Sequence, residues 1–240
     1  MSDHTGRRAL IVGGTSGVGL ATAREFVARG TDTVIASRSP HKLQATLAEL
    51  APLGGSVTAQ ALDIRSDTEV EEFAALAGTF DHVVVSAGET PMGRVDTLSL
   101  ADAYAAMDSK FWGAYRIARA VRIDPAGSLT LVAGYLSQRP GKASALQSAI
   151  NAALEALVRG LALECAPLRV NAVSPGLLRT PLWDGLPEAD RDSMYEAAAR
   201  RLPVARVGEA SDIASAVLFL AGNAYATGST VYVDGGGTIA

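Results

Sequence analysis

The regular alternation of short apolar runs with helical patterns constrains this chain more than any other feature of its sequence. The short runs are rich in β-branched residues and nearly continuous in apolar character, as strands covered on both faces must be. They lie at residues 9–12, 33–36, 56–62, 82–85, 128–133, 169–173 and 230–233. Helical patterns occupy residues 17–29, 40–50, 67–77, 99–121, 143–165 and 211–221. This order predicts an α/β fold, in which a parallel sheet carries helices on both faces.

Length and composition set further bounds. With 240 residues, 48% of them hydrophobic and 19% charged, the chain is expected to form one globular domain over 1–240, with residues 1–6 flexible. A net charge of -4 without a basic stripe argues against nucleic acid as a partner. No apolar run is long enough for a signal peptide or a membrane span, so no membrane partner is expected. The single cysteine, Cys165, and the scattered histidines favour a cytoplasmic protein without a metal site.

The longest irregular stretch is 175–208, whose prolines and charges predict a mobile flap holding a short helix. Long loops of compact domains are often lids over a substrate, so we expect this flap to cover the substrate site. Trp183 and Met194 either cover the substrate or pack under the flap.

A glycine-rich turn follows the first strand and opens the first helix. Gly13, Gly17 and Gly19 have the spacing G-x-x-x-G-x-G, which would let a pyrophosphate approach the backbone at the helix N-terminus. Taken alone, the pattern also suits a tight turn that binds nothing. The second strand ends in Ser37 and Arg38, where an acidic residue would favour NAD, so the sequence predicts the 2′-phosphate of NADP. The alternative for Arg38 is a solvated surface arginine.

The third strand ends at Asp63, whose carboxylate could accept a hydrogen bond from the adenine amino group. Its alternative is a helix N-cap role, for which Ser66 is the better candidate.

These motifs together resemble the short-chain dehydrogenase/reductase family over roughly residues 7–237. The matching pieces are GGTSGVG (13–19), LDI (62–64), SAG (86–88), RVNAVSPGLLRT (169–180) and YVDGGG (232–237). The resemblance implies a doubly wound Rossmann fold with a seven-stranded sheet, a bound NADP(H), and a homodimer or homotetramer built through the fourth and fifth helices. The cofactor-binding residues that it implies are Gly13, Thr15, Ser16, Gly17, Val18, Asp63, Ile64, Ser86, Ala87, Gly88, Pro175, Gly176, Leu178 and Thr180.

The same resemblance implies an unusual catalytic site. The family's Tyr-x-x-x-Lys pair is absent from the chain, and its positions fall on Gln147 and Asn151. The family's serine position falls on Gly134, and its asparagine position falls on Lys110. An amide cannot donate a proton at a useful pKa, so Gln147 is expected only to orient a carbonyl, whereas Asn151 can still bind the ribose hydroxyls of the cofactor.

Several residues are candidates for the missing proton donor. Lys110 would point into the cleft with a pKa lowered by burial, or would be a solvated helix lysine that pairs with Asp108 or a partner subunit. Tyr135 could donate a proton or shape the pocket wall.

Two further residues have other expected roles. Arg139 could bind an anionic group or hold the loop. Trp112 is expected to pack at a helix interface with Tyr115.

The function expected from these residues is NADP(H)-dependent oxidoreduction of a small carbonyl, imine or activated alkene. Two alternatives stay open at this point. The protein could be a catalytically silent NADP(H)-binding sensor or partner subunit, or it could perform non-redox chemistry in the same cleft.

Overall fold

A seven-stranded parallel sheet forms the centre of the computed structural model, which describes residues 5–89 and 91–240. The strand order is β3-β2-β1-β4-β5-β6-β9, as the doubly wound Rossmann fold requires, so that prediction is confirmed. The strands are β1 (Arg8–Val12), β2 (Asp32–Ser37), β3 (Val57–Ala61), β4 (Thr79–Val85), β5 (Arg122–Val132), β6 (Arg169–Pro175) and β9 (Thr230–Val233). The predicted flexibility of residues 1–6 falls mainly on residues 1–4, outside the described residues, while Thr5 and Gly6 form an exposed turn.

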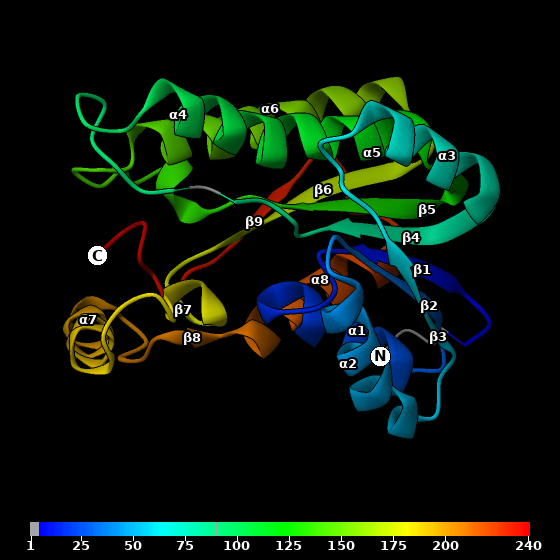
Figure 1. Ribbon diagram of the computed structural model, residues 1–240, viewed down its shortest axis with the longest axis horizontal. Coiled ribbons are helices and arrows are strands. Elements are labelled where there is room, and N and C mark those ends of the chain that lie inside the picture. Colours follow the sequence, from blue (N-terminus) through cyan, green and yellow to red (C-terminus); the bar gives the residue numbers. More distant parts are fainter. Residues whose placement is uncertain (1–4, 90) are drawn as a thin grey trace.

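Helices cover both faces of this sheet (Figure 1). One face carries α1 (Gly17–Ala28), α2 (Pro40–Leu50) and α8 (Ala210–Gly222). The other carries α3 (Asp67–Ala77), α4 (Leu100–Met107), α5 (Gly113–Ala120) and α6 (Ala145–Glu164).

The strand β1 shows how the sequence builds two cores at once. Leu10 and Val12 point into the core under α3, α5 and α6, while Ala9 and Ile11 point into the core under α1, α2 and α8. Side chains alternate between the two faces of a strand, so a strand covered on both sides must be apolar throughout. The nearly continuous apolar runs of the sequence have this cause.

The structure departs from the predicted elements in three places. The strand predicted at 128–133 is longer, since β5 already begins at Arg122. The predicted helix at 99–121 is interrupted by a π-helical segment, Asp108–Trp112, between α4 and α5. The predicted irregular flap at 175–208 contains a 14-residue helix, α7 (Glu188–Arg201), and a short strand, β7 (Leu178–Arg179), which pairs with β8 (Gly208–Glu209). The expected helix is therefore present in this segment but is longer than predicted. Its extent leaves little trace in the sequence, because α7 buries only Tyr195 and Ala198 and has almost no apolar stripe.

The first prediction concerns Gly19, where a Cβ would overlap the carbonyl oxygen of Gly13 and the hydroxyl of Ser86. We expect Gly19→Ala to lower the free energy of unfolding by about 1–3 kcal/mol, because backbone would have to move. Gly160 is a matched control in α6, where a Cβ meets nothing within 4 Å. Gly160→Ala should raise stability by about 0.5–1 kcal/mol through helix propensity. Urea unfolding checks both, and an equal effect of the two changes would contradict the packing argument.

Candidate active site

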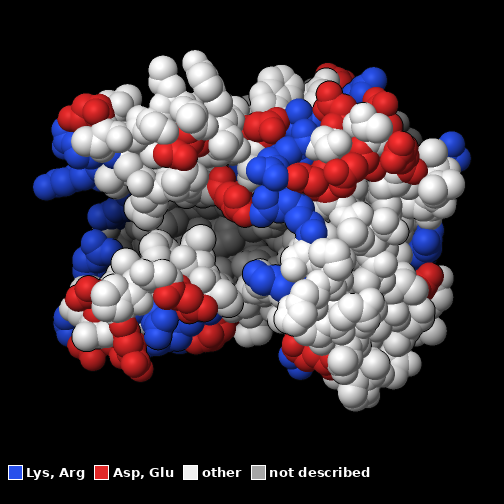
Figure 2. Space-filling view, in the orientation of Figure 1, with Lys and Arg blue, Asp and Glu red and all other residues white. Residues whose placement is uncertain are grey.

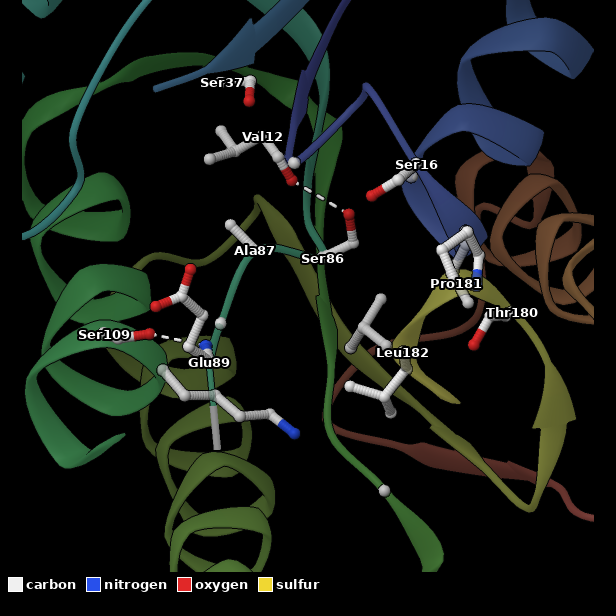
Figure 3. Close-up of a pocket in the computed structure, with 18 of the residues that line it drawn as sticks. Val12, Ser16, Ser37, Ser86, Ala87, Glu89, Ser109, Thr180, Pro181 and Leu182 are labelled. Carbon is white, nitrogen blue, oxygen red and sulfur yellow. Dashed lines mark hydrogen bonds between the residues drawn. The ribbon is translucent and has the colours of Figure 1, made fainter. Parts of the chain in front are cut away.

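A cleft of about 770 Å³ opens at the carboxyl ends of the strands, where the chain turns away from β1 and β4 in opposite directions. Figure 2 shows this face hollowed, with acidic and basic side chains mixed beside the opening. Every residue that the sequence predicted for cofactor binding or catalysis lines this one cleft, although the segments that supply them are spread along the chain. Figure 3 shows side chains from β1, the end of β2, the turn before α1, the segment after β4 and the segment after β7 around the same space.

The glycine-rich turn lies against the end of β4. Gly13 has a φ of +87°, and a Cβ there would come within 2.7 Å of the backbone nitrogen of Ala87. The Ser86 hydroxyl donates to the carbonyl oxygen of Val12 at 3.0 Å, which joins the ends of β1 and β4 (Figure 3). The turn therefore needs glycine for close packing as well as for access by a ligand.

The N-terminus of α1 differs from those of its neighbours. Serine hydroxyls cap α2, α3 and α4, through Ser39, Ser66 and Ser99. Ser16 stands at the same position before α1, but its side chain forms no capping hydrogen bond. The first N–H groups of a helix need external partners, so α1 presents donors and a positive dipole end to the cleft. This is an arrangement that suits an anionic phosphate.

Charged side chains gather at the end of the cleft near β2. Arg38, Lys42 and Arg65 all line it, and sequence reasoning missed the last two. Arg65 donates to both carboxylate oxygens of Asp63, and this hydrogen bonding lowers the pKa of Asp63. The guanidinium of Arg38 forms an ion pair with Glu89. The alternative that Asp63 caps a helix is wrong, since Ser66 caps α3 as expected.

Lys110 lies at the other end of the cleft, in the π-helical segment. Its Nζ donates to the carbonyl oxygen of Ala133 at 3.0 Å and to Oδ1 of Asn151 at 2.8 Å. Burial lowers the pKa of Lys110 to about 8, because desolvation disfavours the ammonium form. The alternative of a solvated lysine paired with Asp108 is wrong, since Asp108 instead accepts from Arg116.

The segment around Lys110 is adapted to this placement. A Cβ at Gly88 would come within 2.8 Å of Cγ of Lys110, so the glycine leaves room for the lysine stem. The π-helical segment inserts an extra residue into the turn, and such segments often occur at functional sites. No periodicity in the sequence distinguishes it from an α-helix.

The two amides of α6 are both buried. Asn151 accepts from Lys110, and Gln147 donates to the carbonyl oxygen of Pro91 at 2.7 Å. A Cβ at Gly134 would come within 2.7 Å of Nδ2 of Asn151, so a larger residue there would displace the amide. Tyr135 lines the cleft in the 3₁₀ turn that follows Gly134.

Sequence reasoning also missed a buried carboxylate one turn beyond Asn151. Glu155 accepts from Ser137 at 2.6 Å, from Ser174 at 3.1 Å and from Tyr232 at 2.9 Å. Burial raises the pKa of Tyr232, and the hydrogen bond to Glu155 raises it further. The carboxylate therefore ties α6 to the ends of β5, β6 and β9, which hold the rear of the cleft.

Of the remaining sequence candidates, only Trp183 lines the cleft. Arg139 is exposed and does not line the cleft. Trp112 is half exposed and contacts the rings of Phe111 and Tyr115. Met194, on α7, packs against the small apolar cluster of Tyr195, Ala198 and Val207, while Trp183 packs against the same cluster and also lines the cleft.

Residues 5–89 and 91–240 contain no group of three or more His, Cys, Asp or Glu side chains placed to hold a metal ion. No helix among them has both the length and the apolar character to cross a membrane. The expected cytoplasmic location stays a prediction.

Comparisons with known proteins agree with this geometry. The model of a family described as enoyl-(acyl carrier protein) reductase matches residues 12–238. The hydroxy(phenyl)methylsuccinyl-CoA dehydrogenase subunit BbsD of Thauera aromatica is 32% identical over 96% of each chain. A solved small-chain dehydrogenase in complex with NADPH is 37% identical, with a TM-score of 0.83 over 98% of this chain and 99% of the other. A variant of actinorhodin polyketide ketoreductase with NADPH is 25% identical, with a TM-score of 0.90 over 100% of this chain and 99% of the other.

The strand order, the glycine-rich turn at the start of α1 and a family match along nearly the whole chain lead to one assignment. The chain belongs to the short-chain dehydrogenase/reductase family.

Proposed function

We propose that this protein is an NADP(H)-dependent oxidoreductase that transfers a hydride between the nicotinamide and a small carbonyl, imine or activated alkene. The observation that carries this proposal is the uncapped start of α1, which faces the same cleft as Ser37 and Arg38. Backbone N–H groups at such a helix end bind phosphate, and an arginine beyond β2 suits the 2′-phosphate. Two solved relatives described as NADPH complexes support the same cofactor.

The residues present fit this dinucleotide. Ser37, Arg38 and Lys42 would hold the 2′-phosphate, and Asp63 and Ile64 would hold the adenine. The other proposed cofactor contacts are the positions that bind the cofactor in the family. They are Gly13, Thr15, Ser16, Gly17 and Val18 for the phosphates, Ser86, Ala87 and Gly88 for the adjacent ribose, and Pro175, Gly176, Leu178 and Thr180 around the nicotinamide. When bound, NADPH supplies the hydride.

We further propose that Lys110 and Asn151 have exchanged the roles of the family's catalytic lysine and asparagine. The ammonium group then reaches the catalytic end from the opposite helix, while Asn151 holds it through Oδ1 and binds ribose. Two of the three Nζ protons of Lys110 contact Ala133 and Asn151, and the third can be donated to the substrate oxygen or nitrogen. A donor with a pKa of about 8 is matched to reaction near neutral pH.

The other cleft residues would position the substrate. Gln147, fixed by Pro91, would orient the carbonyl, and Tyr135 would form the pocket wall or donate a proton itself. Leu182 and Trp183, at the start of the segment 175–208, line the cleft, which supports the proposed role of this segment as a substrate flap.

Nucleotide binding tests the cofactor assignment through Arg38. We expect Arg38→Gln to weaken NADPH binding about tenfold or more while leaving NADH binding within about twofold, because a charge-assisted hydrogen bond is lost only with the 2′-phosphate. Fluorescence titration of the reduced nicotinamide measures both dissociation constants. Arg119→Gln is the control, since Arg119 is exposed and pairs with Glu71 away from the cleft. Equal weakening of NADPH and NADH would contradict the 2′-phosphate assignment.

The pH dependence of catalysis tests Lys110. A panel of carbonyls, imines and enones identifies the substrate class by NADPH consumption, and binding without consumption of any member would favour the silent sensor or partner subunit. For the best substrate, kcat/KM should fall above pH 8, where the ammonium loses its proton. Lys110→Met should lower kcat by about 10²–10⁴-fold and remove this pH break. Full activity in Lys110→Met would exclude Lys110 as the donor.

The same variant should be more stable than the wild type at neutral pH, because it removes a buried charge. The pKa of Lys110 is lowered on folding, so the unfolded chain binds more protons between about pH 8 and 10.5. Wild-type stability therefore rises with pH in this window, and the gap to Lys110→Met narrows. A loss of stability in Lys110→Met would show that its activity defect is structural.

We propose that the protein is a homodimer or homotetramer joined through the fourth and fifth family helices, here α4 with α5, and α6. Leu100, Tyr104 and Trp112 expose apolar surface along the first of these. Tyr104→Glu should reduce the mass measured by light scattering after size exclusion, because a charge would enter the interface. Leu76→Glu on α3 is the control, since this leucine is 89% exposed on another helix, compared with 69% for Tyr104. An unchanged mass for Tyr104→Glu would contradict this interface.

A further inference from the structure

An ion pair bridges the two sides of the cleft at its charged end. The guanidinium of Arg38, just after β2, contacts the carboxylate of Glu89, which follows β4. In the sheet, β1 lies between these two strands, so the pair passes over the glycine-rich turn that follows β1. Both side chains line the cleft.

The backbone of Glu89 is fixed, while its side chain has room to move. Its N–H donates to the hydroxyl of Ser109 at 2.7 Å, and Ser109 is buried in the π-helical segment (Figure 3). The side chain itself is 67% exposed. The carboxylate can therefore leave Arg38 for solvent without disturbing the segment that follows β4.

The other charged groups nearby, among the residues that the structure describes, act on this pair through their charge and form no ion pair with it. Asp63 is engaged by the bidentate contact from Arg65, although the charge of Arg38 also helps to lower the pKa of Asp63, and the charge of Glu89 helps to raise that of Arg65. Glu89 is the acidic side chain with which Arg38 is paired in the described part of the chain. Its carboxylate contacts the guanidinium that, under the proposed function, would bind the 2′-phosphate.

We propose that Glu89 is a residue that sets cofactor selectivity, since its carboxylate competes with the 2′-phosphate for Arg38. This inference rests on the proposed function. A dinucleotide with a 2′-phosphate must displace Glu89 before Arg38 can bind it. A dinucleotide with free ribose hydroxyls leaves the ion pair intact. Because Glu89 then neutralises the charge of Arg38, that charge does not weaken the binding of such a dinucleotide. Glu89 therefore narrows the preference for NADPH over NADH that Arg38 creates.

The exposure of the pair sets the size of the effect. Arg38 is 45% exposed and Glu89 67% exposed, so solvent screens their attraction. Exposed ion pairs of this kind correspond to changes of up to about fivefold in an equilibrium constant. Glu89 is thus expected to tune NADPH affinity without blocking it.

The test measures NADPH and NADH dissociation constants for the wild type, Glu89→Gln, Arg38→Gln and the double variant, at low and high salt. Glutamine keeps the size of the side chain and the backbone bond to Ser109 while it removes the charge. We expect Glu89→Gln to bind NADPH about two- to fivefold more tightly. The fold-change in the NADH dissociation constant should be less than half as large. The gain should vanish in the Arg38→Gln background and shrink at high salt.

A control separates this local effect from the general gain in affinity for an anion when one negative charge is removed. Glu71→Gln makes the same change in net charge on α3, where Glu71 pairs with Arg119 outside the cleft. If Glu71→Gln raises NADPH affinity as much as Glu89→Gln does, the selectivity role of Glu89 is overturned. The same holds if Glu89→Gln raises NADPH affinity equally in the wild type and in the Arg38→Gln variant. Tight NADPH binding that Glu89→Gln leaves unchanged would overturn this inference alone. Binding of neither nucleotide by the wild type would overturn it together with the proposed function.

Discussion

The close approach of backbone at Gly13, Gly19 and Ser86 is the contact on which the site depends. A side chain at either glycine would separate α1 from the ends of β1 and β4. Because the helix can sit this close, its uncapped N-terminus opens directly into the crevice between the diverging connections of β1 and β4. The same contact that completes the core thus places the anion-binding end of a helix dipole in the cleft.

The two ends of the cleft carry different electrostatics. Near β2, the arginines are balanced by carboxylates, and the Arg38–Glu89 pair is largely open to solvent, so its attraction is weak and the pair can exchange partners. Near α6, the ammonium of Lys110 is held by two neutral oxygens and has lost much of its hydration. A buried charge without a counter-charge costs stability, and such groups are concentrated at functional sites. This contrast fits a binding end that adapts to its ligand and a reactive end that is rigid.

Local sequence patterns predicted the structure correctly where a single physical constraint determines the conformation of a short segment. The doubly buried strands, the glycine-rich turn and the cap at Ser66 each follow from backbone and solvent constraints within a few residues. Patterns failed for Arg65, Lys42 and Glu89, whose chemical roles depend on neighbours supplied by other loops. They also underestimated the length of α7, since a helix with little buried surface has no apolar stripe that marks its ends. The π-helical segment was missed because its extra residue leaves no mark on apolar spacing.

The sequence by itself determined the fold class, the order of the elements and which residues gather at the carboxyl ends of the strands. Parallel strands with crossover helices bring all of those ends to one edge, so the order of the chain already implies the cleft. Only the tertiary structure decided how the side chains are paired there: Lys110 with Asn151 rather than Asp108, Arg38 with Glu89, and Glu155 with three hydroxyl groups. The reason is that hydrogen bonds and ion pairs form over a few ångströms, and the partners here lie up to 77 residues apart in the chain.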